Sequence, residues 1–248
     1  MKLNKQLFVC LDCETTGLDS VQDRIIEIAL VIFDFNTNYT TFETLINPEQ
    51  PIPESSVEIH HITQEMVADK PTIREILPQV LSLIGKHIIV GHGIGFDIEM
   101  LIQSAKRMGI VSSLNYNSFI DTLRMARYYG ESPTNSLEQL RKHFNIELEI
   151  AHRAMSDVIV NIEVFKRLGA FYATTEDLFE MLSKPIMMKE MPLGKHKGRP
   201  MKEIPIEYLQ WAANKEFDQD LLFSIRSELK RRKKGNGFSQ VANPFRDL

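Results

Sequence analysis

The chain has 248 residues, of which 43% are hydrophobic and 25% charged, which is typical of an ordinary globular protein. No apolar stretch approaches the length of a membrane-spanning helix, and the first apolar run stops at Asp12, too early for a signal peptide. Two cysteines, Cys10 and Cys13, cannot form a disulfide framework. These features predict a cytoplasmic protein with no membrane partner.

The formal net charge of −4 conceals two oppositely charged regions. Residues 1–180 contain 15 Lys and Arg against 25 Asp and Glu, whereas residues 181–248 contain 14 against 8. The first region should therefore not bind a polyanion through charge alone, and the second region is suited to do so.

The pattern of the first 180 residues predicts three meander strands and then an alternation of strands and helices. The meander strands are expected over 7–13, 25–35 and 39–46, followed by a proline-containing loop over 47–57. The later strands are expected over 87–90 and 119–121, and the helices over 72–84, 96–108, 136–144 and 155–168. This order predicts an α/β fold with a mixed sheet flanked by helices.

A change of composition near residue 183 predicts a second, smaller part. Prolines and glycines punctuate the following segment, so we expect a linker over 184–192 between a domain at 1–183 and a basic α+β module at 193–234. Helices are expected in this module over 206–213 and 221–230. The end of the chain, 235–248, contains two glycines and a proline and is expected to be a flexible tail.

The first candidate site is a pair of acids, Asp12 and Glu14, at the end of the first strand. Side chains at i and i+2 of a strand point to the same face, so the two carboxylates should lie together. They would repel each other, and a divalent cation, which prefers hard oxygen ligands, is a common resolution. Because Asp-x-Glu is frequent by chance, the pair alone is a weak indication.

Two further segments supply acids at the starts of helices. Asp97 follows a glycine-rich turn after the strand at 87–90, and ligands of α/β sheets gather at the carboxyl ends of strands. Asp157 lies in the first turns of the helix at 155–168, with His152 in the loop before it. Taken singly, each has a simpler interpretation: Asp97 as a helix cap, His152 as a surface histidine and Asp157 as a first-turn acid.

Taken together and in order, Asp12-x-Glu14, Phe96-Asp97 and His152-x-x-x-x-Asp157 resemble the DEDDh (DnaQ-like) family of 3′→5′ exonucleases, over residues 7–168. Smaller matches are Thr15-Thr16-Gly17-Leu18, Ile59-His60-His61-Ile62-Thr63 and Asp121-Thr122-Leu123. The chain departs from the family at Gly93, where Asn is frequent, and at His61, where Gly is common.

The resemblance implies a ribonuclease H-like fold and hydrolysis of phosphodiester bonds with two Mg²⁺ or Mn²⁺ ions, about 3.5–4 Å apart. It implies that Asp12 bridges the ions, that Glu14 and Asp157 bind the ion on the nucleophile side, and that Asp97 supports the leaving-group side. His152 would take a proton from the attacking water, a role suited to its near-neutral pKa.

The same resemblance implies contacts to the last nucleotide of the substrate. The backbone of Thr15 and Thr16 would hold it, Leu18 would act as a wedge against its base, and His61 or Ile62 would pack near it. Core packing is an equally good interpretation of Leu18.

The C-terminal module resembles that of exodeoxyribonuclease X-like proteins in its segments 192–200 and 204–211. Its glycines permit a tight hairpin from which Lys195, Lys197 and Arg199 would contact phosphates, although a solvated basic turn competes with this interpretation. Core packing is preferred over base stacking for Tyr208 and Trp211. The basic run 230–234 is either a solvated helix end or a phosphate-binding patch.

Together these features predict a metal-dependent 3′→5′ exodeoxyribonuclease that acts at DNA 3′ ends, single-stranded or frayed, in repair or proofreading. The alternatives are a proofreading subunit like the epsilon subunit of DNA polymerase III, docked on a polymerase or clamp, and an exoribonuclease acting on RNA 3′ ends. A non-catalytic nucleic-acid-binding module is disfavoured because all four acids and the histidine are present.

Overall fold

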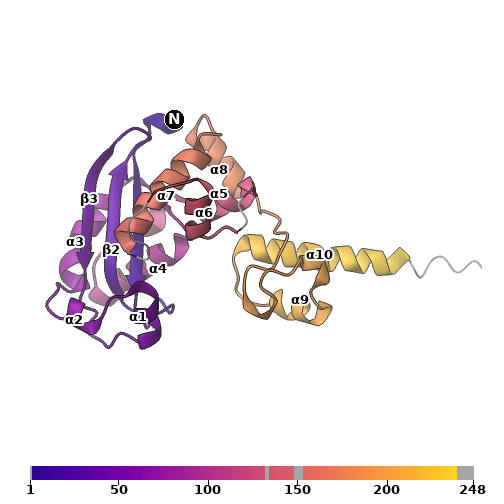
Figure 1. Cartoon of the computed structure of the whole chain (residues 1–248), viewed down its shortest axis with the longest axis horizontal. Coiled ribbons are helices and arrows are strands. Elements are labelled where there is room, and N and C mark those ends of the chain that lie inside the picture. Colours follow the sequence, from indigo (N-terminus) through magenta and orange to yellow (C-terminus); the bar gives the residue numbers. More distant parts are fainter. Residues whose placement is uncertain (1, 132–133, 148–152, 239–248) are drawn as a thin grey trace, which may run out of the picture. The chain divides into compact units, whose positions relative to one another are not determined.

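The computed structural model describes residues 2–131, 134–147 and 153–238, with side chains up to residue 234, and divides the chain into two compact units (Figure 1). The first unit is Met1–Leu182 and the second is Ser183–Leu248. Within the described residues, none of the helices combines the length and apolar character needed to cross a membrane.

A mixed sheet of five strands, in the order β3-β2-β1-β4-β5, forms the centre of the first unit. Antiparallel pairing joins β1 to β2 and β2 to β3, whereas β4 runs parallel to both β1 and β5. The strands are β1 (Phe8–Thr15), β2 (Ile25–Phe33), β3 (Asn38–Leu45), β4 (Ile88–Gly91) and β5 (Phe119–Asp121). This is the α/β, ribonuclease H-like arrangement that the sequence predicts, with β1 in the middle.

Helices cover both faces of this sheet and give it two apolar cores. They are α1 (Glu54–His60), α2 (Gln64–Val67), α3 (Ile73–Ile84), α4 (Gly95–Met108), α5 (Thr122–Tyr129), α6 (Leu137–His143), α7 (Ala154–Gly169) and α8 (Thr175–Ser183). Short 3-10 turns occur at Leu3–Lys5 and Leu114–Tyr116. Apolar residues of α5, α6, α7 and α8 fill one core, and those of α3 and α4 fill the other.

The central strand β1 contributes to both cores because its side chains alternate. Phe8 and Cys10 belong to the core beneath α7, and Val9, Leu11 and Cys13 belong to the opposite core. The two cysteines are free and buried on opposite faces. By the same alternation, Asp12 and Glu14 share the face of Phe8 and Cys10, so they point toward α7.

Aromatic packing fixes α7 on the sheet. The ring of Phe165 on α7 meets Phe8 of β1 edge to face at 4.9 Å between centroids, and it contacts Phe33 of β2 at 5.9 Å. Such pairs stabilise by about 0.5–1.5 kcal/mol beyond the area that they bury. The second half of α7 is thereby held on β1 and β2, both of which the helix contacts (Figure 1).

The structure corrects several predicted boundaries. The expected loop over 47–57 already contains the start of α1, at Glu54. The sequence patterns did not reveal α2, α5 or α8, since these helices are short or begin directly after a strand. The helix expected over 72–84 is confirmed as α3: the Thr72 side chain and Glu75 form a reciprocal capping box before it, and Pro78 lies inside it.

The second unit is built on α9 (Ile206–Ala212) and α10 (Gln219–Phe238), with 3-10 turns at Gly194–His196 and Met201–Glu203. The expected β part is reduced to an isolated antiparallel bridge between Glu190 and Pro200. Two further differences concern boundaries. Met188 and Met191, in the expected linker, pack in the apolar cluster of this unit, and α10 continues into the range expected as a tail.

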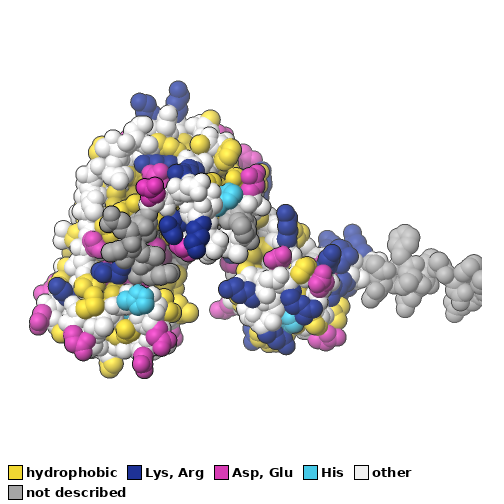
Figure 2. Space-filling view, in the orientation of Figure 1, with side chains coloured by type: hydrophobic (Ala, Val, Ile, Leu, Met, Phe, Trp, Pro, Cys, Tyr) yellow, Lys and Arg dark blue, Asp and Glu magenta, His cyan; other side chains and the backbone are white. Residues whose placement is uncertain are grey.

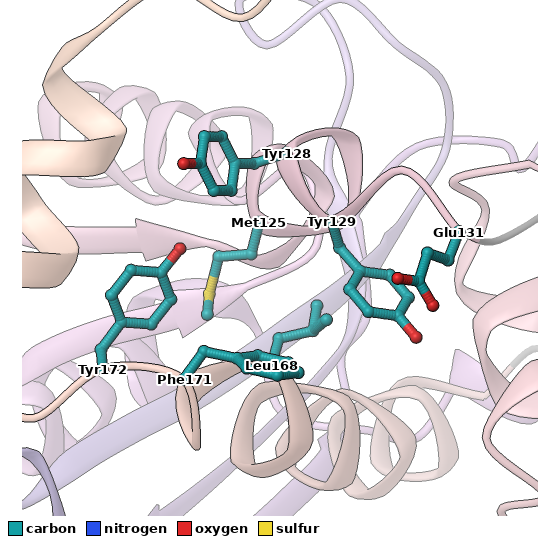
Figure 3. Close-up of a pocket in the computed structure, with 7 residues that line it drawn as sticks. All are labelled: Met125, Tyr128, Tyr129, Glu131, Leu168, Phe171 and Tyr172. Atoms are coloured by element: carbon teal, nitrogen blue, oxygen red, sulfur yellow. The ribbon is translucent and has the colours of Figure 1, made fainter.

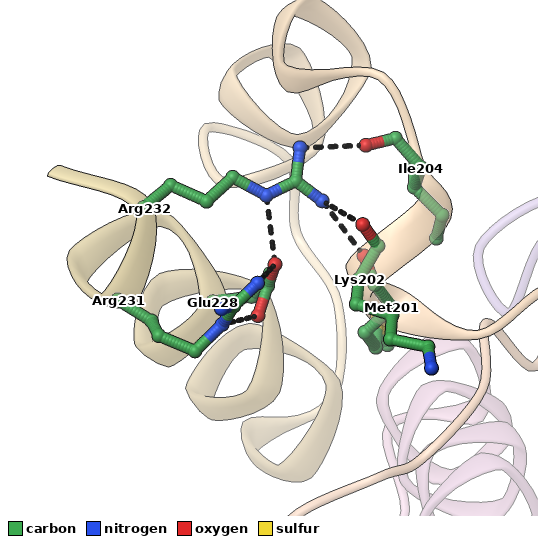
Figure 4. Close-up of polar contacts among 6 residues, drawn as sticks. All are labelled: Met201, Lys202, Ile204, Glu228, Arg231 and Arg232. Atoms are coloured by element: carbon green, nitrogen blue, oxygen red, sulfur yellow. Dashed lines mark hydrogen bonds and ion pairs between the residues drawn. The ribbon is translucent and has the colours of Figure 1, made fainter. Parts of the chain in front are cut away.

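A partly buried polar clamp joins α10 to the turn before α9 (Figure 4). Arg232 donates to the Glu228 carboxylate at 2.7 Å and to the carbonyl oxygens of Met201, Lys202 and Ile204 at 2.8–3.0 Å. Arg231 pairs with the same carboxylate at 2.8 Å. The basic run at 230–234 is therefore not a uniform cationic surface, because its two arginines are engaged within the unit.

Candidate active site

Three of the predicted site residues converge at one point of the first unit. Asp12 and Glu14 on β1 and Asp157 on α7 each offer a carboxylate oxygen, and these oxygens lie within 4.8 Å of one another. All three side chains are partly exposed. The strand alternation brings the first two together, and the docking of the first turn of α7 brings the third from 143 residues further along the chain.

Asp97 stands beside this group on the first turn of α4. Its Oδ1 accepts a hydrogen bond from the backbone N–H of Cys13 at 3.0 Å, so the carboxylate contacts β1 between Asp12 and Glu14. The tight turn from β4 into α4 depends on Gly91, since a Cβ there would stand 2.3 Å from the Ile94 side chain. Asp97 is 6% exposed, which is unusual for a carboxylate and calls for a compensating charge.

Crowding and burial disfavour ionisation of these acids. Burial raises the pKa of Asp12 well above its ordinary value, and the neighbouring charges of Asp97, Asp157 and Glu14 add to the effect. The pKa of Glu14 is raised to about 7, first by burial and then by Asp157. Burial likewise raises the pKa of Asp97 to about 7. A group of acids that resist losing their protons one by one is suited to share a cation.

Glu27, which is not among the residues predicted from the sequence, joins the site from β2. It is opposite Glu14 in the strand pairing and is completely buried. Its carboxylate forms a bidentate pair with Arg153 and accepts from the backbone N–H of Ala154, the first residue of α7, at 3.0 Å. A charged residue in the apolar run 25–33 was the available signal, because a buried Glu needs a partner.

The proposed base, His152, lies outside the described residues. Its neighbour in the chain, Arg153, is described and pairs with Glu27 directly before the first residue of α7. Glu27 and Arg153 therefore hold the start of the helix that carries Asp157 in place.

The loop after β1 carries three of the predicted substrate contacts. Leu18 is 87% exposed, so core packing is excluded for it. Thr16 is buried: its N–H donates to the Arg24 carbonyl at 2.9 Å, and its carbonyl accepts from Ser56 at 2.8 Å. The Thr15 hydroxyl donates to the Gly17 carbonyl at 2.7 Å. Thr16 therefore shapes the loop, and its backbone N–H is not available to a nucleotide.

The other two predicted substrate contacts, His61 and Ile62, follow α1 and differ in solvent exposure. His61 is exposed and adopts the left-handed conformation, with φ 60°, which explains why Gly is common at this position. Ile62 is completely buried against Ile26 and Val67. The prediction that Ile62 can pack against the substrate is wrong for this conformation, since its side chain has no exposed surface.

The three predicted phosphate contacts of the second unit, Lys195, Lys197 and Arg199, differ in how far contacts within the unit already engage them. Arg199 donates to His196 Nδ1 at 3.2 Å and to the Glu203 carbonyl at 3.0 Å, so it braces its own turn. Lys195 lies over the Tyr208 ring, with Nζ 5.2 Å from the centroid. Lys197 is exposed. Figure 2 shows lysine and arginine side chains gathered on this unit, toward the end of α10 in particular.

A separate pocket of about 290 Å³ lies between α5 and the end of α7 (Figure 3). Its lining is mainly aromatic and apolar: Met125, Tyr128, Tyr129, Glu131, Leu168, Phe171 and Tyr172. Among these residues only Glu131 carries a charge, so the pocket lacks the donor set that the carboxylate group supplies. The chemistry of the first unit therefore belongs to the acids on β1, α4 and α7.

The donor set at these acids fits a divalent cation. Carboxylate oxygens are the ligands that Mg²⁺ and Mn²⁺ prefer, and three of them lie close enough to bind one ion. Asp97 adds a fourth carboxylate at the margin of the group.

The chain is similar in sequence to known exonucleases and DNA polymerases. The family model described as Exonuclease matches residues 9–165, and a second, described as "Putative quorum-sensing-regulated virulence factor", matches residues 180–241. Among curated relatives, PolC-type DNA polymerase III of Caldanaerobacter subterraneus subsp. tengcongensis is 34% identical over 162 residues, which cover 65% of this chain and 11% of that protein. The Bacillus subtilis (strain 168) protein of the same name is 35% identical over 156 residues, which cover 62% of this chain and 11% of that protein. The chain thus spans about a tenth of the length of these relatives.

The fold is also similar to solved structures of exonucleases. Exonuclease X in complex with 5′ overhanging duplex DNA is similar at 26% identity and a TM-score of 0.56, over 70% of this chain and 98% of that chain. A zinc-bound complex of E. coli ExoI with ssDNA is similar at 25% identity and a TM-score of 0.63, and the match covers 72% of this chain and 43% of that chain. With the match over residues 9–165 and the acids in place on β1, α4 and α7, this chain belongs to the exonuclease family, in its DnaQ-like, 3′→5′ branch.

Proposed function

We propose that this protein is a divalent-metal-dependent 3′→5′ exodeoxyribonuclease that removes nucleotides from DNA 3′ ends. The observation that carries the proposal is the convergence of Asp12, Glu14 and Asp157 within 4.8 Å, with Asp97 bonded to the strand between the first two. The relatives support the substrate, because two of the similar structures are exonucleases bound to DNA. Repair and proofreading are the processes that use such an activity.

In this proposal the acids bind the metal ions, and the other residues of the site accept a proton or contact the nucleotide. Asp12, Glu14, Asp97 and Asp157 are the proposed ligands of two Mg²⁺ or Mn²⁺ ions. When bound, the ions supply positive charge at the scissile phosphate and increase the acidity of water. His152 accepts the proton of the attacking water. Leu18, fully available on its loop, packs against the terminal base, and His61 and Thr15 lie on the segments proposed to border the nucleotide.

The proposal is tested with the full chain and 3′-labelled oligonucleotides. We expect Mg²⁺ or Mn²⁺ to support stepwise shortening of single-stranded and frayed DNA from the 3′ end, and EDTA to stop it. RNA of the same sequence, run in parallel, decides between the DNA and RNA alternatives. Products that shorten from the 5′ end, or full activity in EDTA, would contradict the proposal.

A matched control separates the site from the general loss of an acid. Glu99 is an exposed acid on α4, two residues from Asp97, and its carboxylate accepts a hydrogen bond from Gln103 at 2.7 Å. Glu99→Gln should retain activity, whereas Asp97→Asn should lose it. Equal loss in both variants would remove the carboxylate group from the proposal.

A second candidate function is proofreading in association with a DNA polymerase. The similarity to a segment of PolC-type DNA polymerase III favours it, since that relative is by name a DNA polymerase. Co-purification of the tagged chain with a polymerase or clamp from its own cells would support this role. Excision that prefers a mismatched over a paired 3′ end would support it further.

A further inference from the structure

One face of the second unit carries two neighbouring aromatic rings, each with a lysine over it. Tyr208 and Trp211 are neighbours one turn apart on α9, with ring centroids at 5.2 Å. Lys195 Nζ lies 5.2 Å from the Tyr208 centroid, and Lys215 Nζ lies 5.1 Å from the Trp211 centroid. These four side chains are called the aromatic row below.

The Tyr208 ring is packed against its own unit, and the Trp211 ring is half exposed. Trp211 is 50% exposed, whereas Leu209 and Ala212, on the other side of the helix, are completely buried. Tyr208 is partly buried and packs edge to face on His196 at 4.5 Å. Gly194, with φ 70°, leaves the room that the tyrosine needs, because a Cβ there would stand 2.9 Å from its hydroxyl oxygen. The row is therefore an ordered surface feature of the unit.

The charges of the row remain available, unlike those of the nearby arginines. Arg231 and Arg232 are paired with Glu228, and Arg199 braces its own turn. Within the described part of the chain, neither Lys195 nor Lys215 is within ion-pair distance of a carboxylate. The exposed acids Glu207 and Glu216 are adjacent in sequence to the row and set a limit on its positive potential.

This chemistry matches one ligand, a nucleobase attached to a phosphate backbone. Stacking of a base on an aromatic ring stabilises by about 1–3 kcal/mol, and the ring does not discriminate between bases. An exposed ammonium over a ring gains only about 0.5–1 kcal/mol, so a base can displace Lys215 from the indole, and the ammonium can then move to the adjacent phosphate. A duplex offers no free base faces, because its bases are already stacked.

We propose that the aromatic row of Lys195, Tyr208, Trp211 and Lys215 is a binding site for single-stranded DNA, in which unpaired bases stack on Trp211 and Tyr208 and the lysines contact their phosphates. It is separate from the carboxylates of the first unit and needs no metal. The second unit thus holds strand that is not being cleaved.

Trp211 reports on the site directly, because it is the only tryptophan of the chain. Oligo(dT) is titrated into the full chain in EDTA, so that no hydrolysis is possible, and binding is followed by anisotropy of the labelled oligonucleotide together with tryptophan emission. Stacking should quench the emission in step with binding. Trp211→Ala should weaken binding by about 5–150-fold, the range that corresponds to one stacked base.

Three controls make the result decisive. Phe223→Ala removes another partly exposed aromatic side chain of the same unit, on α10, and should bind as the unaltered chain does. An abasic oligonucleotide of equal length keeps the phosphates but should neither quench nor bind as tightly. Lys215→Gln should reduce the slope of log K against log salt by about 0.7, the share of one phosphate contact on a single strand.

The proposal is overturned if saturating oligo(dT) leaves the tryptophan emission unchanged, or if Trp211→Ala and Phe223→Ala bind equally well. Equal affinity for the abasic and the normal strand would show that charge alone holds the DNA. Because every measurement is made without metal, these outcomes are independent of whether the first unit proves to be an exonuclease.

Discussion

The two units shift the pKa of a glutamate in opposite directions. In the first unit, burial and neighbouring acids raise the pKa of Glu14 to about 7. In the second, the Arg231 guanidinium and then that of Arg232 lower the pKa of Glu228 to about 2. The first unit leaves acids without enough cations, and the second uses its arginines to satisfy an acid. Unsatisfied charge is therefore the better guide to a ligand site than net charge, in both units.

The largest expected effect comes from removing the central acid of the first unit. Asp12→Asn should lower metal-dependent hydrolysis by more than about 1,000-fold, since the ions supply several kcal/mol of charge stabilisation. It should also raise the melting temperature of the metal-free protein by roughly 2–4 °C, the shift that about 1 kcal/mol of relieved repulsion gives in a chain of this size. Calorimetry and a nuclease assay measure both. A variant that is less stable as well as inactive would mean that the acids do not repel one another.

His152 should contribute to turnover but not to metal binding. His152→Ala should lower kcat by about 10²–10⁴-fold, the usual contribution of a general base, and leave metal affinity within about twofold. Calorimetric titration of Mn²⁺ beside single-turnover kinetics separates the two quantities. Full activity in this variant would remove the base from the mechanism, whatever the acids do.

How far these residues follow from sequence depends on how local their signals are. The Asp12 and Glu14 pair and the long helices could be predicted, because strand alternation and helical periodicity act over a few residues. The role of Glu27 could not, because its partner Arg153 is 126 residues away, and only packing brings them together. In the same way, the run at 230–234 suggested five equivalent cations, but the carbonyl oxygens that occupy Arg232 come from 28 to 31 residues earlier.

The raised pKa values predict an unusual pH dependence of metal binding. Ordinary carboxylates are ionised by pH 6, but Glu14 and Asp97 keep protons up to about pH 7. Mn²⁺ affinity should therefore rise by about tenfold per pH unit for each proton released between pH 5 and 7, and then level off. Calorimetry in buffers of different ionisation enthalpy counts these protons.

The stability of the metal-free protein should change in the opposite sense. A carboxyl group with a raised pKa in the folded state stabilises the fold below its ordinary pKa, and this stabilisation is lost as the pH rises through 7. The first unit should melt at a lower temperature at pH 8 than at pH 5, and divalent metal should restore it. Glu228 acts in the reverse direction, since its contribution is lost only as the pH falls from about 4.5 toward 2.

A smaller effect is expected at the buried pair behind the site. Glu27→Gln removes the charge that holds Arg153 and the start of α7, and it should destabilise the first unit by about 1.5–3 kcal/mol, as for other hydrogen bonds to charged groups. As a positioning residue, Glu27 should affect kcat more than KM, by about tenfold. Glu27→Asp should recover part of the stability. A loss of stability with unchanged kcat would limit Glu27 to folding.

The smallest effect tests which cations of the second unit are structural. Arg232→Gln should destabilise this unit by about 1–3 kcal/mol, because it leaves three carbonyl oxygens without their donor and the Glu228 carboxylate with Arg231 as its remaining arginine partner. Lys233→Gln removes an exposed charge next to it and should change stability by less than about 0.5 kcal/mol. For DNA affinity the order should reverse at low salt, since Lys233 is exposed and Arg232 is occupied. If both variants bind and unfold alike, then Arg232 is as free as its neighbours, and the contrast between the two units would rest on the acids alone.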